Sequence, residues 1–532
     1  MPLSGNSENE KNMVNNIHNV SEMPTIPKNT KRILLLFSII GIVGCLLILI
    51  PQVRNAIILF GERFIVHRKL NNSVWNGILI QVSSSILLLF FFGFIFSKSH
   101  QNFLLLLPII FGYLVVAIYG VNILYWDEWN LPVFINGILE HGIRFKDFVS
   151  QHNEHRLVFP KIVFLIIGLI FHINSKVYMY VSWILNSFIY LSLISYLKHI
   201  TKNQNSKMNI FIALLLGFIV FDTIQIENLL WGFQIGFIMV NCFAVLSFYL
   251  FHIWTFSNKN KYLIFSLIAA VVSAFSALHG LFVLPVILCI MGIDSFSKKE
   301  FVAKNYIYIL IPLIFVYTFY FYNYHKVPYH PDYFGAPLYK LPLYFFCVLG
   351  SPLIPRYYNQ FDLVFRTVFM GFIIFSTNII ITIYLIRKKK VNMNIFPLCL
   401  IYFSFVFCAS LTMGRVGFGI GQALSLRYTS CVLLGIAGLV LIIFNEFIIN
   451  NRKQFVAYGL FALFFLIMAQ NTDFSSLRNY SELRKMQQNI LLDYRNQPLE
   501  NLKNIRSWND YESAKERIEL IESHKWSVFF EK

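Results

Sequence analysis

The sequence predicts an all-α, polytopic transmembrane helix bundle of about 13 helices, and composition and hydrophobic patterning both lead to this class. Of its 532 residues, 57% are hydrophobic and only 13% are charged. A soluble domain of this length would need more charge to cover its surface. The apolar residues also occur in blocks of roughly 20, which is the length that crosses a bilayer. We further expect interfacial helices in the first large external loop and a small external C-terminal helical tail.

The chain is expected to have three parts. Residues 1–32 are polar and predict a disordered cytoplasmic N-terminus. Residues 33–470 form the transmembrane domain, and residues 471–532 form the tail, where apolar positions recur at helical spacing between charges. Membrane helices are expected near residues 33–51, 75–97, 103–121, 177–197, 208–222, 233–254, 262–278, 280–293, 306–322, 364–386, 395–411, 428–446 and 454–470.

Basic residues in short loops predict the orientation of the bundle. The net charge of +18 does not indicate nucleic-acid binding, because Lys and Arg gather between apolar blocks, as the positive-inside rule describes. Five basic loops separated by pairs of helices are therefore expected in the cytoplasm: 198–207, 259–261, 298–304, 387–390 and 452–453. Residues 122–176 then form one external loop, in which 157–172 lies in the interface or re-enters the membrane. The N-terminus is predicted to be cytoplasmic and the C-terminus external, at a bacterial inner membrane.

Four polar clusters are candidates for chemistry. The first is an acidic pair between tryptophans, Asp127 and Glu128, where a helix leaves the membrane. Such carboxylates are consistent with a helix cap in an interfacial aromatic belt, or with a general base or metal ligand for a lipid-borne substrate.

The second cluster runs from Gln151 to Arg156, just before an apolar segment. If it is helical, His152, His155 and Arg156 share one face, at spacings of three and four residues. The cluster, which includes Glu154, is consistent either with a solvated helix start or with a site that binds phosphate or orients an acceptor hydroxyl. A pair of histidines alone provides too few ligands to predict a metal site.

The third and fourth clusters lie further along the chain. Glu227, Trp231 and Gln234 would share one helical face, either as an interhelical hydrogen-bonding set or as part of a site. Arg415 and Arg427 flank a glycine-rich external loop. Arginine makes bidentate contacts with phosphate, although arginines in a flexible loop can instead extend toward the headgroups.

Taken in order, these motifs resemble the GT-C class of integral membrane glycosyltransferases, and more closely a group of bacterial polytopic membrane proteins. The resemblance covers roughly residues 100–470. It implies inverting transfer of a sugar from a polyprenyl-phosphate donor to a cell-envelope glycan or lipid acceptor outside the cytoplasm. It also implies that Asp127 is the base or metal ligand, that Glu128 supports it, and that Arg415 or Arg427 holds the donor phosphate. A divalent cation is compatible with this chemistry, but no metal ligand set is predicted.

Two other functions remain open at the sequence level. A transporter or a lipid or polysaccharide flippase would place ionisable residues deep in several helices, whereas here they gather at one face. An O-antigen polymerase or ligase would also use external arginines but would not need the acidic pair.

Overall fold

The structure is a computed structural model that describes residues 104–201, 206–354, 360–448, 474–503, 505 and 511–530. These residues belong to one compact unit, Asn102–Lys532. The predicted disordered segment 1–32 and the predicted helices at 33–51, 75–97 and 454–470 lie outside the described residues.

The described part of the chain is almost entirely helical, which confirms the predicted all-α class. Within it, eight segments are long and apolar enough to cross a membrane: Ser175–Thr201, Met208–Leu230, Gly232–Ser257, Leu278–Lys298, Ala303–Phe321, Phe361–Arg387, Asn392–Phe418 and Leu426–Glu446. This is the pattern of a multi-pass membrane protein.

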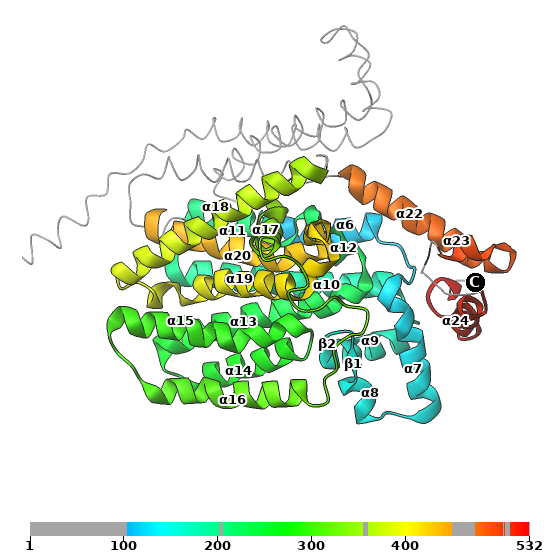
Figure 1. The fold of residues 1–532 in the computed structure, drawn as a ribbon, viewed down its shortest axis with the longest axis horizontal. Coiled ribbons are helices and arrows are strands. Elements are labelled where there is room, and N and C mark those ends of the chain that lie inside the picture. The colour runs from blue at the N-terminus through cyan, green and yellow to red at the C-terminus, as the bar shows by residue number, and fades with distance from the viewer. Residues whose placement is uncertain are drawn as a thin grey trace, which may run out of the picture. The chain divides into compact units, whose positions relative to one another are not determined.

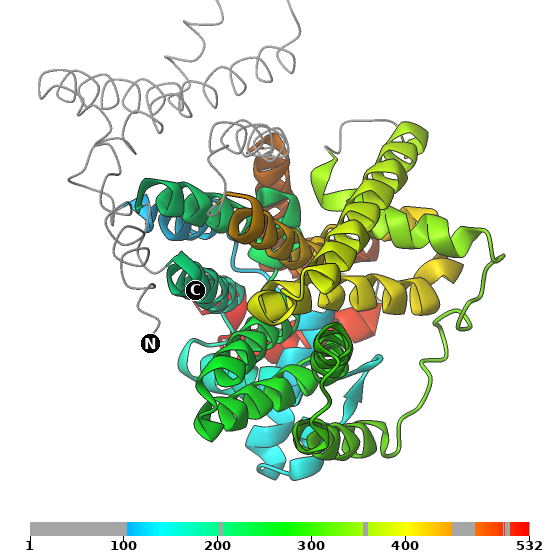
Figure 2. The ribbon, with the colours of Figure 1, turned by 90° about the vertical axis from the view of Figure 1, so that its left-hand side faces the viewer.

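The long helices run side by side along one direction, except that α18 is inclined to the others (Figures 1 and 2). They are α10 (Ser175–Thr201), α11 (Ser206–Val220), α13 (Ile235–Ser257), α14 (Asn260–Ala274), α15 (Val283–Lys298), α16 (Ala303–Phe321), α18 (Gln360–Arg387), α19 (Ile395–Arg415) and α20 (Thr429–Ile443). The helix ends show familiar sequence causes. Asn174 caps α10, since its Oδ1 accepts from the backbone N–H of Lys176 at 3.0 Å, and Asn258 ends α13 in the left-handed conformation.

The sequence did not predict helix α17 (Lys340–Gly350), which lies between the expected membrane helices 306–322 and 364–386. It packs closely along α18 because glycines meet at their crossing. A Cβ on Gly350 would lie 1.9 Å from the carbonyl oxygen of Thr367, and one on Gly371 would lie 2.0 Å from that of Phe346. Such close backbone approach is typical of membrane helix pairs.

Two ends of the bundle can be told apart by their loops. At one end, called here the basic end, Ser297 Oγ donates to the Ile386 carbonyl at 3.0 Å, and Lys390 Nζ is 2.5 Å from Glu446 Oε2. The first contact brings the basic loops 298–304 and 387–390 together, as the topology predicts, and the second joins 387–390 to Glu446.

The opposite end, called here the hairpin end, carries the smaller elements (Figure 1). They are α6 (Leu107–Tyr119), the 3-10 turn η2 (Trp126–Trp129), α7 (Asn130–His141), α8 (Phe145–Val149), strands β1 (Gln151–His152) and β2 (His155–Arg156), α9 (Val158–Ile170) and η5 (Leu278–Phe282). Helix α9 falls in the segment 157–172. At about 1.5 Å per residue, its 13 residues span roughly 20 Å, less than the hydrocarbon thickness of a bilayer.

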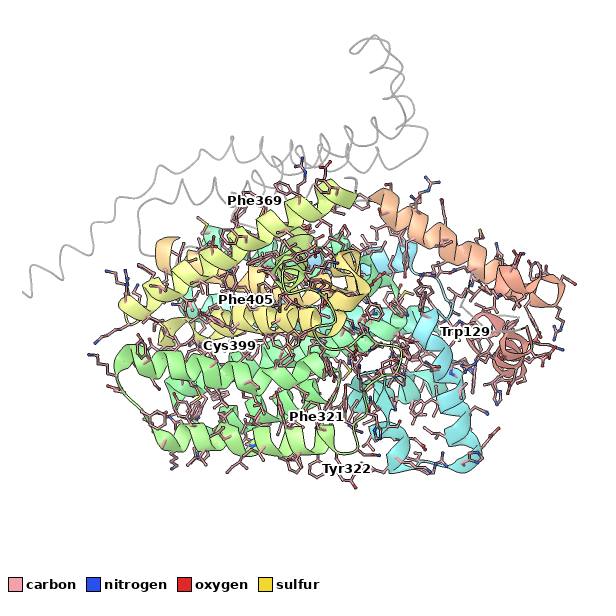
Figure 3. The ribbon with its side chains drawn as sticks, viewed as in Figure 1. Trp129, Phe321, Tyr322, Phe369, Cys399 and Phe405 are labelled. Atoms are coloured by element: carbon pink, nitrogen blue, oxygen red, sulfur yellow. The ribbon has the colours of Figure 1, made fainter. Side chains whose placement is uncertain are left out.

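The C-terminal tail also packs at the hairpin end, with helices α22 (Phe474–Leu492), α23 (Leu499–Lys503) and α24 (Tyr511–Ser523). Its buried apolar residues from Leu491 to Phe529 share one hydrophobic core with residues 121–178, and Leu477 belongs to a second core with Val115 and Val116 of α6. Trp129 belongs to the first of these cores, and its carbonyl accepts from Arg517 Nη1 at 3.1 Å (Figure 3). The tail and the first large loop therefore belong to the same end of the molecule.

Candidate functional site

The second polar cluster forms a β-hairpin, so the helical face predicted for His152, His155 and Arg156 is wrong. Strands β1 and β2 pair antiparallel, with His152 opposite His155. Asn153, the first turn residue, has a φ of 50°, which an Asn tolerates better than most residues. The hairpin thus brings the two histidines together by cross-strand pairing and leaves Glu154 in the turn.

Glu154 is surrounded by cationic and imidazole groups. Its carboxylate forms an ion pair with Arg415, and it lies 3.5 Å from His330 Nδ1 and 3.7 Å from His155 Nε2. The Glu154 side chain is only 16% exposed. This cluster joins the first large loop to the end of α19 and to residues 322–339, the segment between α16 and α17, here called the strap.

Hydrogen bonds define the tautomers of both histidines. The backbone N–H of Leu278 donates to His155 Nδ1 at 3.2 Å, so a neutral His155 carries its proton on Nε2, facing Glu154. Burial lowers the pKa of His155 to about 3, and His152 adds to the effect, so His155 is neutral near pH 7. Arg415 Nη1 lies 3.2 Å from His330 Nε2, and because arginine only donates, the His330 proton is on Nδ1, again facing Glu154.

Asp127 lies beside this cluster and is more open to solvent. Its Oδ2 is 3.9 Å from His152 Nε2, and its side chain is 35% exposed. Its negative charge also acts on His155 and on Arg427. Of the acidic pair, Asp127 is thus the carboxylate that faces the cluster.

Glu128 has a different environment from its neighbour. It is fully buried; its Oε1 accepts from the Ser175 hydroxyl at 2.8 Å, and its Oε2 accepts from the Tyr125 N–H at 3.0 Å. Burial raises the pKa of Glu128 to about 8, against the opposing effect of these hydrogen bonds. The contacts tie η2 to the start of α10, so Glu128 supports the turn that carries Asp127.

The third cluster is not one helical face, contrary to the sequence prediction. Helix α12 (Ile226–Leu230) ends before Trp231, whose backbone is extended, and η4 (Gly232–Gln234) follows. The break directs Trp231 Nε1 to the Tyr125 carbonyl, at 3.1 Å. Gln234 is buried, and Glu227 Oε2 accepts from the backbone N–H of Arg427 at 3.2 Å.

Arg427 differs from Arg415 in its partners. No ion pair within 4.0 Å is found for Arg427 in the described part of the chain, and its buried Nε has no hydrogen-bond partner there. Its guanidinium lies over the Tyr428 ring, 5.5 Å from the centroid. The Arg427 guanidinium also shares a side-chain hydrogen bond with Tyr428, so the donor that it retains is Nε, whereas Arg415 is committed to Glu154.

Arg156 is directed away from the other predicted residues. Its guanidinium donates to the carbonyls of Val149 at 2.6 Å and Tyr320 at 2.5 Å, and also to that of Tyr322. It is buried and joins the hairpin to the end of α16, where Tyr322 begins the strap (Figure 3).

The structure therefore gathers Asp127, His152, Glu154, His155, Arg415 and Arg427 at the hairpin end. Sequence reasoning missed His330 and Tyr329, whose hydroxyl bonds to Asn153. The available signal was the polar and aromatic run Tyr329–Tyr333 within a long loop, but no spacing relates it to the hairpin. Among the described residues, no group of three or more His, Cys, Asp or Glu side chains could hold a metal ion.

No protein-family profile matches the chain, and no curated protein matches it in sequence. The chemistry of the site itself therefore carries the functional argument.

Proposed function

We propose that this protein is a membrane glycosyltransferase of the GT-C type, placed in a bacterial inner membrane with the hairpin end outward. It would move a sugar from a polyprenyl-phosphate donor to a glycan or lipid acceptor of the cell envelope. The proposal rests on the Asp127 carboxylate, which is accessible to solvent at one end of an apolar helix bundle. This carboxylate interacts electrostatically with the nearby guanidinium of Arg427.

In the proposed reaction, Asp127 accepts the proton of the acceptor hydroxyl as its oxygen attacks the anomeric carbon. The bond from that carbon to the donor phosphate breaks, and its electron pair leaves with the phosphate. A lipid phosphate needs little acid assistance, so the protein must supply a base and neutralise the growing negative charge. His152 Nε2 lies 3.9 Å from Asp127 Oδ2, so the imidazole is the neighbouring side chain on the hairpin side of the carboxylate.

Arg427 is the residue we assign to the donor phosphate. Guanidinium groups bind phosphate through two parallel N–H donors, and the Arg427 Nε has no protein partner within the described residues. The alternative, Arg415, would have to give up or share its ion pair with Glu154. We therefore assign Glu154, His330 and Arg415 to holding the hairpin, the strap and α19 together around the site.

The alternative of a transporter or flippase predicts movement of a substrate without bond cleavage. A transporter or flippase would use the same accessible cluster only as a binding site. The two functions are therefore distinguished by whether a new glycosylated product forms, and not by the affinity for the substrate. An O-antigen polymerase or ligase would transfer a preassembled glycan, and the acceptor product would reveal this directly.

The test measures sugar transfer by the purified full-length protein in lipid nanodiscs, with a panel of polyprenyl-phosphate sugars as donors. Asp127→Asn removes the base at nearly constant volume and is expected to lower turnover by about 100- to 10,000-fold. Asp147→Asn is the matched control, because Asp147 is a carboxylate of the same loop that pairs with Arg144 at 3.0 Å. Unchanged turnover in Asp127→Asn would remove Asp127 from the mechanism.

The phosphate assignment is tested with Arg427→Lys, which keeps the charge and loses the bidentate fork. Donor binding is expected to weaken by about 1–3 kcal/mol. Arg144→Lys, on an exposed side chain, is the control and should bind donor as the wild type does. Wild-type affinity in Arg427→Lys would transfer the assignment to Arg415.

A further inference from the structure

The backbone immediately before Asp127 is strained. Trp126 has a φ of 45°, in the left-handed region that a bulky residue enters only when its surroundings hold it there. Its side chain is 55% exposed, so burial of the indole does not provide the constraint. The residues around the turn must provide it instead.

Tyr125, the residue before Trp126, is held from three sides. Its N–H donates to Glu128 Oε2 at 3.0 Å, and its carbonyl accepts from Trp231 Nε1 at 3.1 Å. The third contact comes from the C-terminal tail: the guanidinium carbon of Arg484 lies 3.2 Å from the centroid of the Tyr125 ring.

The Arg484 guanidinium is oriented by contacts within its own helix, independently of Tyr125. It is 5% exposed, its Nη1 donates to Gln487 Oε1 at 2.7 Å, and its Nη2 donates to the Tyr480 hydroxyl at 3.0 Å. These partners lie on the same helix, α22, so the helix presents the guanidinium in a fixed plane. A planar guanidinium that lies against an aromatic ring and is shielded from water makes a strong cation–π interaction.

We propose that Arg484 is a positioning residue for Asp127: it holds Tyr125 in place, and Tyr125 maintains the left-handed turn at Trp126 that directs the Asp127 side chain. The tail then acts on the reaction without touching the substrate. The catalytic consequence rests on the proposed function, whereas the effect of Arg484 on the turn does not.

The experiment compares Arg484→Met and Arg484→Lys with Arg478→Met in the full-length protein. Arg478 is the matched control, an exposed arginine of the same helix whose guanidinium pairs with Glu482 at the surface. The first measurement is amide hydrogen exchange of residues 122–130 by mass spectrometry. Exchange there should be roughly tenfold faster in Arg484→Met, intermediate in Arg484→Lys and unchanged in Arg478→Met, while exchange in α10 stays as in the wild type.

The second measurement is steady-state transfer. Arg484→Met should lower kcat roughly tenfold and leave the donor KM unchanged, because donor binding is assigned to Arg427; Arg484→Lys should recover part of kcat. Three results in Arg484→Met would each overturn the proposal. The first is hydrogen exchange at the wild-type rate in residues 122–130, and the second is exchange that becomes faster in α10 as well as in these residues. The third is an unchanged kcat. If Arg484→Met does not fold, wild-type exchange and kcat in Arg484→Lys overturn it. If the wild-type protein transfers no sugar but hydrogen exchange changes as expected, the glycosyltransferase proposal fails. The inference that Arg484 holds the turn at Trp126 through Tyr125 would then still stand.

Discussion

Glu154 in the hairpin turn is ion-paired with Arg415 at the end of α19, across a sequence separation of 261 residues. The pair joins two polar motifs that are independent in the sequence. It also draws in His330 from the strap, which lies 3.5 Å from the same carboxylate. The three segments around Asp127 are thereby held by one mostly buried charge cluster.

This pair should be strongly coupled energetically. Both side chains are less than one-fifth exposed, so removal of one partner leaves the other charge poorly solvated. Arg415→Met and Glu154→Gln should each lower the free energy of unfolding by about 1–3 kcal/mol, with a coupling of about 0.5–3 kcal/mol in the double variant. Reversible unfolding in detergent measures both. The exposed pair Lys326–Asp332 is the control, and additive effects for Glu154 and Arg415 would contradict the prediction.

Stability should fall with rising pH because of Glu128. Its pKa is raised from 4.5 to about 8 by burial, so the folded protein binds this proton more tightly than the unfolded chain does. The stabilisation is complete below about pH 4.5 and is lost as pH rises toward 8, at no more than about 1.4 kcal/mol per pH unit. Thermal melting between pH 5.5 and 8 checks this. Glu128→Gln should flatten the profile, and an equally steep profile in that variant would assign the slope to other groups.

The tail should be required for folding of the hairpin end. Ile518 of α24 is fully buried in the core that the tail shares with residues 121–178. Ile518→Ala should lower the free energy of unfolding by about 2–5 kcal/mol, whereas Met486→Ala, at a side chain 51% exposed, should have little effect. The same measurement applies to truncation after Asn471, which should leave the shared core open. A truncated protein as stable as the full chain would show that the tail contributes nothing.

The basic end and the hairpin end should face opposite sides of the membrane. Lys390 is at the basic end, and the tail that ends at Lys532 packs at the hairpin end. By the positive-inside rule, reporter fusions at Lys390 should report a cytoplasmic location and fusions at Lys532 an external one. The same side for both would refute the proposed orientation.

The sequence alone determined the membrane class and most of the described long helices, because apolar blocks and basic loops are local properties. The prediction for 428–446, for example, overlaps α20 (Thr429–Ile443), since little but length and hydrophobicity is needed to recognise such a segment. It also singled out Asp127, Glu154, Arg415 and Arg427, because charges are rare in so apolar a chain.

Only the tertiary structure decided how those residues meet. Residues 151–156 form a hairpin rather than a helix because the strap and α16 supply partners for Asn153 and Arg156. His330 and Arg484 enter from segments far away in the sequence, and no periodicity records such contacts. The buried Glu128 and the more exposed Asp127 are adjacent and chemically alike, so their different environments follow from Ser175 and Tyr125 on one side and His152 on the other. Contacts between distant segments set these environments, and a local sequence pattern carries no information about them.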